Sequence, residues 1–175
     1  MVFLITTCLF YCFVVIDLII SDLCYDSTTE PWDHQVTTSE ISNFIKQADA
    51  ANSSNNYTIM FWHKPLDTHL LSSVFEDRHI SCMQHIYWCK PAQYGMLPVG
   101  FYTNSVEMAT VGYHPNQKAC RTSQSKDPRS RPNFFTHPSL TKLYKAPDGK
   151  AINPCQKPAE LLREIVALHC PPGGN

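Results

Sequence analysis

Glycine is scarce in this sequence, with only six among 175 residues. None of the six lies in a glycine-rich loop that leads into a helix, the arrangement that lets a backbone approach a cofactor closely. Gly173 and Gly174 follow a proline in a turn, with no helix after them. The sequence therefore lacks a glycine-rich cofactor loop.

Metal-binding spacing is missing as well. The eight cysteines stand at positions 8, 12, 24, 82, 89, 120, 155 and 170, without a CxxC pair or a Cys/His cluster. A structural metal site is therefore not expected. Two uses of the cysteines stay open. Inside a cell they would be free thiols that pack as small hydrophobes, whereas in a secreted protein six of them would suit disulfides.

No basic residue precedes the apolar N-terminal segment from Val2 to Ile16, so the positive start of a signal peptide is absent. Asp17 interrupts this segment before it reaches the about 20 residues that span a bilayer. Membrane association is not expected, and we predict an intracellular protein of the nucleus or cytoplasm. Sequons at Asn52 and Asn56 keep open a minority alternative, a secreted or membrane-anchored disulfide glycoprotein without enzymatic activity.

The charge is unevenly distributed. Residues 1–112 carry 4 Lys/Arg and 11 Asp/Glu, a net charge of −7, whereas residues 113–150 carry 8 Lys/Arg and 2 Asp, a net charge of +6. A basic stretch in an otherwise acidic chain favours contact with a polyanion. A solvated loop would have the same composition.

Strands and helices alternate through the first half of the sequence. Apolar, β-branched runs predict strands at 14–20, 57–62, 80–88 and 105–112, the first of them buried on both faces. Thr37 and Glu40 have the spacing of a capping box, so a helix is expected to start there and to fray within 52–56. Further helices are expected near Pro65 and from Pro158, with no periodicity between 114 and 150. This order predicts an α/β fold.

The first predicted strand delivers an acid and an aromatic residue at its end. Residues 21–25 (Ser-Asp-Leu-Cys-Tyr) place Asp22 and Tyr25 where strand gives way to loop, the position at which α/β sheets bind ligands. This segment resembles the Asp-Pro-Pro-Tyr signature of S-adenosylmethionine-dependent amino-methyltransferases that act on nucleic-acid bases.

A second segment matches the same family. Residues 153–158 (Asn-Pro-Cys-Gln-Lys-Pro) and the helix after them resemble the His-Pro-Thr-Gln-Lys-Pro-x-x-Leu-Leu segment of the DNA N-4/N-6 methylases. Residues 168–173 look like the family's Ser-Pro-Pro-Gly turn. Trp88-x-Lys90 and a Gly-Phe-Tyr-x-Asn-x-x-Glu run ending at Glu107 look like the strands that precede its target-recognition region. The order of these segments is that of the beta group.

The resemblance implies an incomplete Rossmann-like methyltransferase fold with a central, mostly parallel sheet flanked by helices. Residues 14–175 would form a partial methyltransferase domain, truncated before the family's glycine-rich cofactor loop. Within it, 113–150 would be a nucleic-acid recognition loop, while residues 1–13 form an apolar segment without an assigned role.

The resemblance also implies an activity, site-specific DNA methylation at adenine N6 or cytosine N4, impaired in a truncated chain. Asp22 and the carbonyl of Leu23 would accept the amine's N–H groups, and Tyr25 would stack on a flipped base. S-adenosyl-L-methionine would bind near Asp22, Gln156 and Lys157. DNA would be the partner, with RNA as an alternative, and its phosphates would contact Lys118, Arg121, Lys126, Arg129 and Arg131.

The family's two prolines are replaced here by Leu23 and Cys24, which do not fix the backbone. The resemblance therefore predicts a looser loop after Asp22, with less reliable acceptor geometry. A degenerate methylase that only binds nucleic acid is the remaining alternative.

Overall fold

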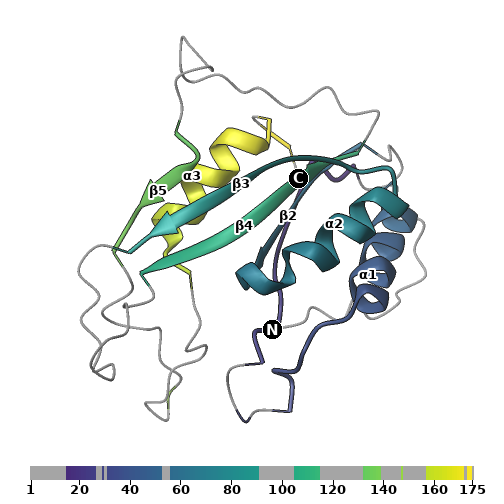
Figure 1. Cartoon of the computed structure of the whole chain (residues 1–175). Helices are drawn as coiled ribbons and strands as arrows, with labels where there is room; N and C mark the ends of the chain where they lie inside the picture. Colours follow the sequence, from purple (N-terminus) through teal and green to yellow (C-terminus); the bar gives the residue numbers. More distant parts are fainter. Residues whose placement is uncertain are drawn as a thin grey trace.

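The computed structural model describes residues 15–26, 29, 31–52, 56–90, 105–114, 132–138, 147, 157–171 and 173–174. These residues form a five-stranded sheet with the order β1-β2-β4-β3-β5. The strands are β1 (Leu18–Asp22), β2 (Thr58–His63), β3 (Ser81–Cys89), β4 (Val106–Tyr113) and β5 (Phe134–Thr136). Figure 1 shows the sheet with helices on both of its faces.

The sheet is mostly parallel in direction. β1 pairs with β2 in parallel, and β3 pairs with β5 in parallel, while β4 is antiparallel to both β2 and β3. All strands except β4 therefore run the same way. This arrangement confirms the predicted α/β class and the predicted mostly parallel sheet flanked by helices.

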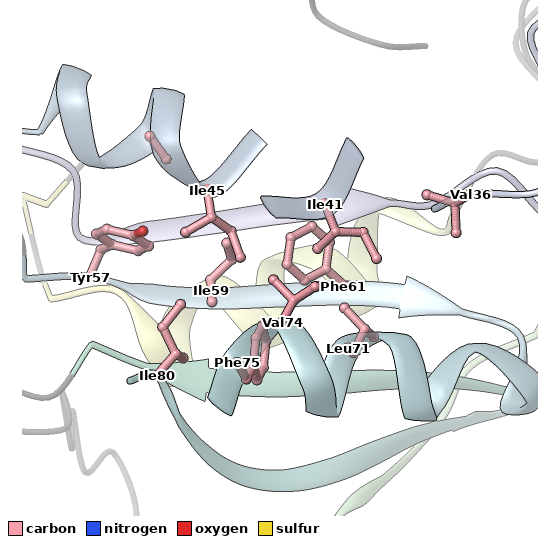
Figure 2. Packing of buried hydrophobic residues seen from close by; sticks show 11 residues of the cluster. Val36, Ile41, Ile45, Tyr57, Ile59, Phe61, Leu71, Val74, Phe75 and Ile80 are labelled. Atoms are coloured by element: carbon pink, nitrogen blue, oxygen red, sulfur yellow. The ribbon is translucent and has the colours of Figure 1, made fainter. Parts of the chain in front are cut away.

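Two helices cover one face of the sheet. In α1 (Thr38–Ala51) the Thr37 side chain caps Glu40 N, and the Glu40 carboxylate binds Thr37 N in return, which confirms the predicted capping box. A short 3₁₀ turn, η1 (Pro65–Asp67), leads into α2 (Thr68–Asp77). Figure 2 shows the apolar cluster between these helices and β2; its members are Val36, Ile41, Ile45, Ala48, Tyr57, Ile59, Phe61, Leu71, Val74, Phe75 and Ile80.

The opposite face is covered by α3 (Ala159–His169), as Figure 1 shows. Alternate residues of β2 point to the two faces, so Met60 and Trp62 join this second cluster. Leu161 and Ile165 of α3 are fully buried against them. The helix therefore holds Lys157, which lies two residues before its first residue, near one edge of the sheet.

Two elements differ from the sequence prediction. β1 starts at Leu18 rather than at 14, and its first residues are half-buried instead of buried on both faces. Within the described residues β1 pairs only with β2, so its backbone has a neighbour on one side alone. The short β5 was not predicted, because three residues are too few to establish a period of two.

Asn52 bears on the glycoprotein alternative. Its side chain is only 3% exposed, donates a hydrogen bond to the Ile16 carbonyl at 3.0 Å and accepts one from Ile16 N at 3.3 Å. A glycan on this amide would break the contact, so this sequon is not an acceptor in the folded chain. Among the described cysteines, Cys24 and Cys89 are free thiols.

The described part of the chain contains no helix with the length and apolar character required to cross a bilayer.

The packing of α3 is testable by truncating one side chain. Leu161→Ala should lower the free energy of unfolding by about 2–5 kcal/mol, because Leu161 is fully buried and its loss leaves a cavity. Leu66→Ala is the matched control, since Leu66 is 80% exposed, and should change the free energy by less than about 0.5 kcal/mol. Urea unfolding measures both, and equal effects would contradict the packing described here.

Candidate active site

Asp22 is the last residue of β1, and the sheet fixes its position. In the parallel register Asp22 lies beside Trp62, and Leu23 N continues the pairing by donating to the Trp62 carbonyl at 2.9 Å. The carboxyl ends of β1 and β2 therefore lie at one edge of the sheet. Ligand sites of α/β folds form at this edge.

The loop after Asp22 is held by a buried carboxylate. Asp33 Oδ1 accepts hydrogen bonds from Tyr25 N at 2.8 Å and from Asp26 N at 2.7 Å, and the Cys24 thiol donates to the Trp32 carbonyl at 3.1 Å. The looseness of this loop relative to the family stays a prediction. Although the two family prolines are absent, Asp33 supplies a constraint that the local sequence does not indicate.

Lys157 reaches Asp22 from the other end of the chain. Its Nζ lies 2.5 Å from Asp22 Oδ2 and 3.0 Å from Glu107 Oε2. Glu107 is near the start of β4, and because β4 runs opposite to its neighbours, its start lies at the carboxyl edge of the other strands. Glu107 also forms an ion pair with Lys90, directly after β3. We call these four side chains the charge chain.

Aromatic rings border the charge chain. Lys157 Nζ lies 5.6 Å from the centre of the Tyr25 ring and 5.5 Å from that of Trp62, within the range of cation–π attraction. The Lys157 side chain is 8% exposed, whereas that of Asp22 is 38% exposed. The acid is thus the part of the pair that faces solvent.

The surroundings shift both pKa values. Burial is the largest influence on Asp22 and raises the pKa of its carboxyl above the ordinary value, against the opposing effects of Lys157 and of the Tyr25 hydroxyl. Burial also acts on Lys157 and by itself would lower the pKa of the ammonium. The Asp22 and Glu107 carboxylates outweigh it, so the pKa of Lys157 is raised.

The structure brings together only some of the residues that the sequence singled out. Asp22, Leu23, Tyr25 and Lys157 gather at the carboxyl edge of the sheet. Gln156 lies outside the described residues, and so do the predicted phosphate contacts Lys118, Arg121, Lys126, Arg129 and Arg131. In the described ranges, no three or more His, Cys, Asp or Glu side chains are grouped to bind a metal ion.

Sequence reasoning did not assign a role to several neighbours of this site. Glu107 and Lys90 occurred in motifs of the family resemblance, but only the β3–β4 register shows that they meet. Trp62 is a buried core residue, yet its ring also borders Lys157. Asp33 lies in an acidic loop without any pattern that marks it.

Comparison with known proteins yields a likeness in structure alone. No protein-family model and no curated protein matches the chain. The crystal structure of an M1.HpyAVI–SAM complex aligns with 91% of this chain and 69% of that one, with a TM-score of 0.60 and 18% sequence identity. A second structure, of M1.HpyAVI, aligns with 91% of this chain and 67% of that one, with a TM-score of 0.61 and 15% identity. The chain therefore shares the fold of a protein that was crystallised with SAM.

The contribution of Lys157 to folding is testable by removing its charge. Lys157→Met should lower the free energy of unfolding at pH 7 by roughly 3 kcal/mol, because it leaves Asp22 and Glu107 without their shared cation. Arg163→Met is the control, since Arg163 is 76% exposed and forms an ion pair with the exposed Glu160. It should cost less than about 1 kcal/mol.

The difference in folding stability between wild type and Lys157→Met should depend on pH. Because folding raises the pKa of Lys157, its contribution is fully present below the unfolded pKa of about 10.4 and is lost as the pH rises through the folded pKa. The stability difference between wild type and Lys157→Met should therefore persist at pH 9 and shrink at pH 11. Urea unfolding at the two pH values measures it, and an unchanged difference would contradict the raised pKa.

Proposed function

We propose that this chain is an S-adenosyl-L-methionine-dependent methyltransferase that acts on an exocyclic amine, adenine N6 or cytosine N4, in DNA. The observation that carries the proposal is Asp22, an acid held by Lys157 at the carboxyl edge of the sheet. Support also comes from the fold, which is shared with a SAM-bound protein, and from the two sequence segments that resemble amino-methylases. Both segments meet at this acid.

The chemistry requires an activated nitrogen. The lone pair of an exocyclic amine is delocalised into the base, and hydrogen bonds that hold the nitrogen tetrahedral free it for attack. In the proposal Asp22 and the Leu23 carbonyl accept the two N–H groups, and Tyr25 stacks on the base. The cofactor would supply an electrophilic methyl group, whose bond to the sulfonium sulfur would break as the nitrogen attacks, leaving a neutral thioether. Asp22 then takes up the proton that the nitrogen releases.

Lys157 keeps the acid suited to this task. To accept the amine's N–H groups and then its proton, the Asp22 carboxyl must be ionised when the amine binds, although burial favours its neutral form. The ammonium of Lys157, 2.5 Å away, opposes that effect of burial. We further propose that the cofactor lies near Asp22, Gln156 and Lys157, and that the basic residues between 118 and 131 contact phosphates.

The remaining context is part of the proposal. Free thiols at Cys24 and Cys89 and the occupied amide of Asn52 support an intracellular protein over a secreted glycoprotein. A nucleic-acid-binding protein without catalysis is the second candidate, because Lys157 already occupies Asp22 Oδ2 in this structure.

Substitution of the acid tests the activity directly. The full chain is incubated with methyl-labelled S-adenosyl-L-methionine and with duplex DNA or RNA, and the methylated nucleosides are separated and counted. Asp22→Asn keeps the size of the side chain but removes the charge that accepts the proton, so we expect a loss of about 100-fold or more. Asp77→Asn, at the exposed end of α2, should leave the rate close to wild type.

Two results would contradict the proposal. One is the absence of both N6-methyladenine and N4-methylcytosine with wild-type protein. The other is an Asp22→Asn variant as active as wild type. DNA binding together with no calorimetric response to S-adenosyl-L-methionine would establish the second candidate instead.

A further inference from the structure

Glu107 is the part of the charge chain that the proposed reaction does not use. The β3–β4 ladder fixes its position, since Glu107 lies opposite Trp88 and Lys90 N donates to the Ser105 carbonyl at 2.7 Å. The Lys90 ammonium lies 4.8 Å from the centre of the Trp88 ring and binds Glu107 Oε1. One oxygen of Glu107 is therefore held from the side of β3.

The other oxygen of Glu107 faces the acid. Oε2 lies 3.0 Å from Lys157 Nζ, which in turn lies 2.5 Å from Asp22 Oδ2. Negative and positive side chains alternate along the charge chain, in the order Asp22, Lys157, Glu107 and Lys90. With Glu107 only 18% exposed, little water is present to screen these contacts. A change at Glu107 therefore reaches Asp22 through Lys157, in addition to the direct repulsion between the two carboxylates.

We infer that Glu107 is a positioning residue, which holds the Lys157 ammonium so that Asp22 keeps the orientation and the charge it needs. The inference rests on the proposed methyl transfer. Glu107 touches neither Asp22 nor the base in this arrangement, and it acts through Lys157. Lys90 serves the same end, because its ammonium, which lies over the Trp88 ring, pairs with the carboxylate of Glu107.

A purely structural ion pair would not have the same consequences. Stability alone does not require one, because buried ion pairs are often replaced by apolar residues at little cost. The groups that face Asp22 in the described chain are Lys157, Tyr25 and Glu107. Lys157 and Glu107 act on the pKa of Asp22 in opposite directions, since the cation lowers it and the second carboxylate raises it.

The test is the pH profile of methyl transfer by the full chain. Glu107→Gln should shift the acidic limb of kcat to higher pH, because a misplaced Lys157 no longer lowers the pKa of Asp22; loss of the like charge alone would shift the limb to lower pH. Lys157→Met should shift it to higher pH, because Asp22 loses its cation. Glu107→Gln should also reduce kcat at pH 7.5 by about tenfold through misplacement of Lys157, with the KM for DNA unchanged. Glu160→Gln, which removes an exposed carboxylate paired with Arg163, should leave the profile unchanged.

A second measurement does not depend on activity. In protein with isotope-labelled lysine, NMR titration should show a lower pKa for the Lys157 ammonium in Glu107→Gln than in wild type, because one of its two carboxylates is gone. An unchanged Lys157 titration would overturn the inference whether or not the protein is active.

The outcomes separate the inference from the function on which it rests. If wild type transfers methyl groups but Glu107→Gln has the wild-type acidic limb, the inference fails and the proposed function stands. If wild type transfers none, the proposed function fails, and the positioning role for catalysis fails with it. Shifts of the limb to higher pH in both variants support both, whereas a shift to lower pH in Glu107→Gln shows direct repulsion without a positioning role and overturns the inference.

Discussion

The contact between Lys157 and Asp22 is the interaction on which the site depends. It joins residues 135 positions apart and connects the start of α3 to the end of β1. An ammonium buried this deeply is stable only beside carboxylates, and Asp22 and Glu107 supply them. The same contact sets the charge of Asp22, so folding and the proposed chemistry share one ion pair.

The sheet makes this contact possible through the direction of its strands. Parallel strands bring the ends of β1, β2 and β3 to one edge, and the reversed β4 brings its beginning to that edge too. Asp22, Lys90 and Glu107 therefore come together from three strands. Asp33 adds the loop, because its carboxylate binds two backbone N–H groups next to Tyr25. Rigid elements thus place every described member of the site.

Much of the fold could be predicted because short-range sequence patterns indicate its helices and strands. The capping box at Thr37 and Glu40 and the apolar spacing of α3 are short-range patterns, and both gave the correct element. Asp22 at a strand end followed from the apolar run before it, and resemblance to a family predicted Lys157 only as a residue near the cofactor; their contact was not predicted. The start of β1 was placed too early, because apolar residues continue upstream of the paired segment.

The rest depends on contacts that no local pattern encodes. The pairing of Glu107 with Lys90 requires the β3–β4 register. The hydrogen bond from the loop backbone to Asp33 requires a turn that the acidic stretch does not predict. The cofactor contact at Gln156 and the five phosphate contacts between 118 and 131 stay predictions, since those residues lie outside the described part.

Zero-length cross-linking is the most direct measurement of the central contact. A carbodiimide activates exposed carboxylates, and an activated Asp22 forms an amide with an amine that touches it. The account predicts an isopeptide bond between Lys157 and Asp22 in the peptide mass spectrum, together with slow acetylation of Lys157 relative to the exposed Lys46. A Lys157 that is acetylated as fast as Lys46 and is never linked to Asp22 would contradict it.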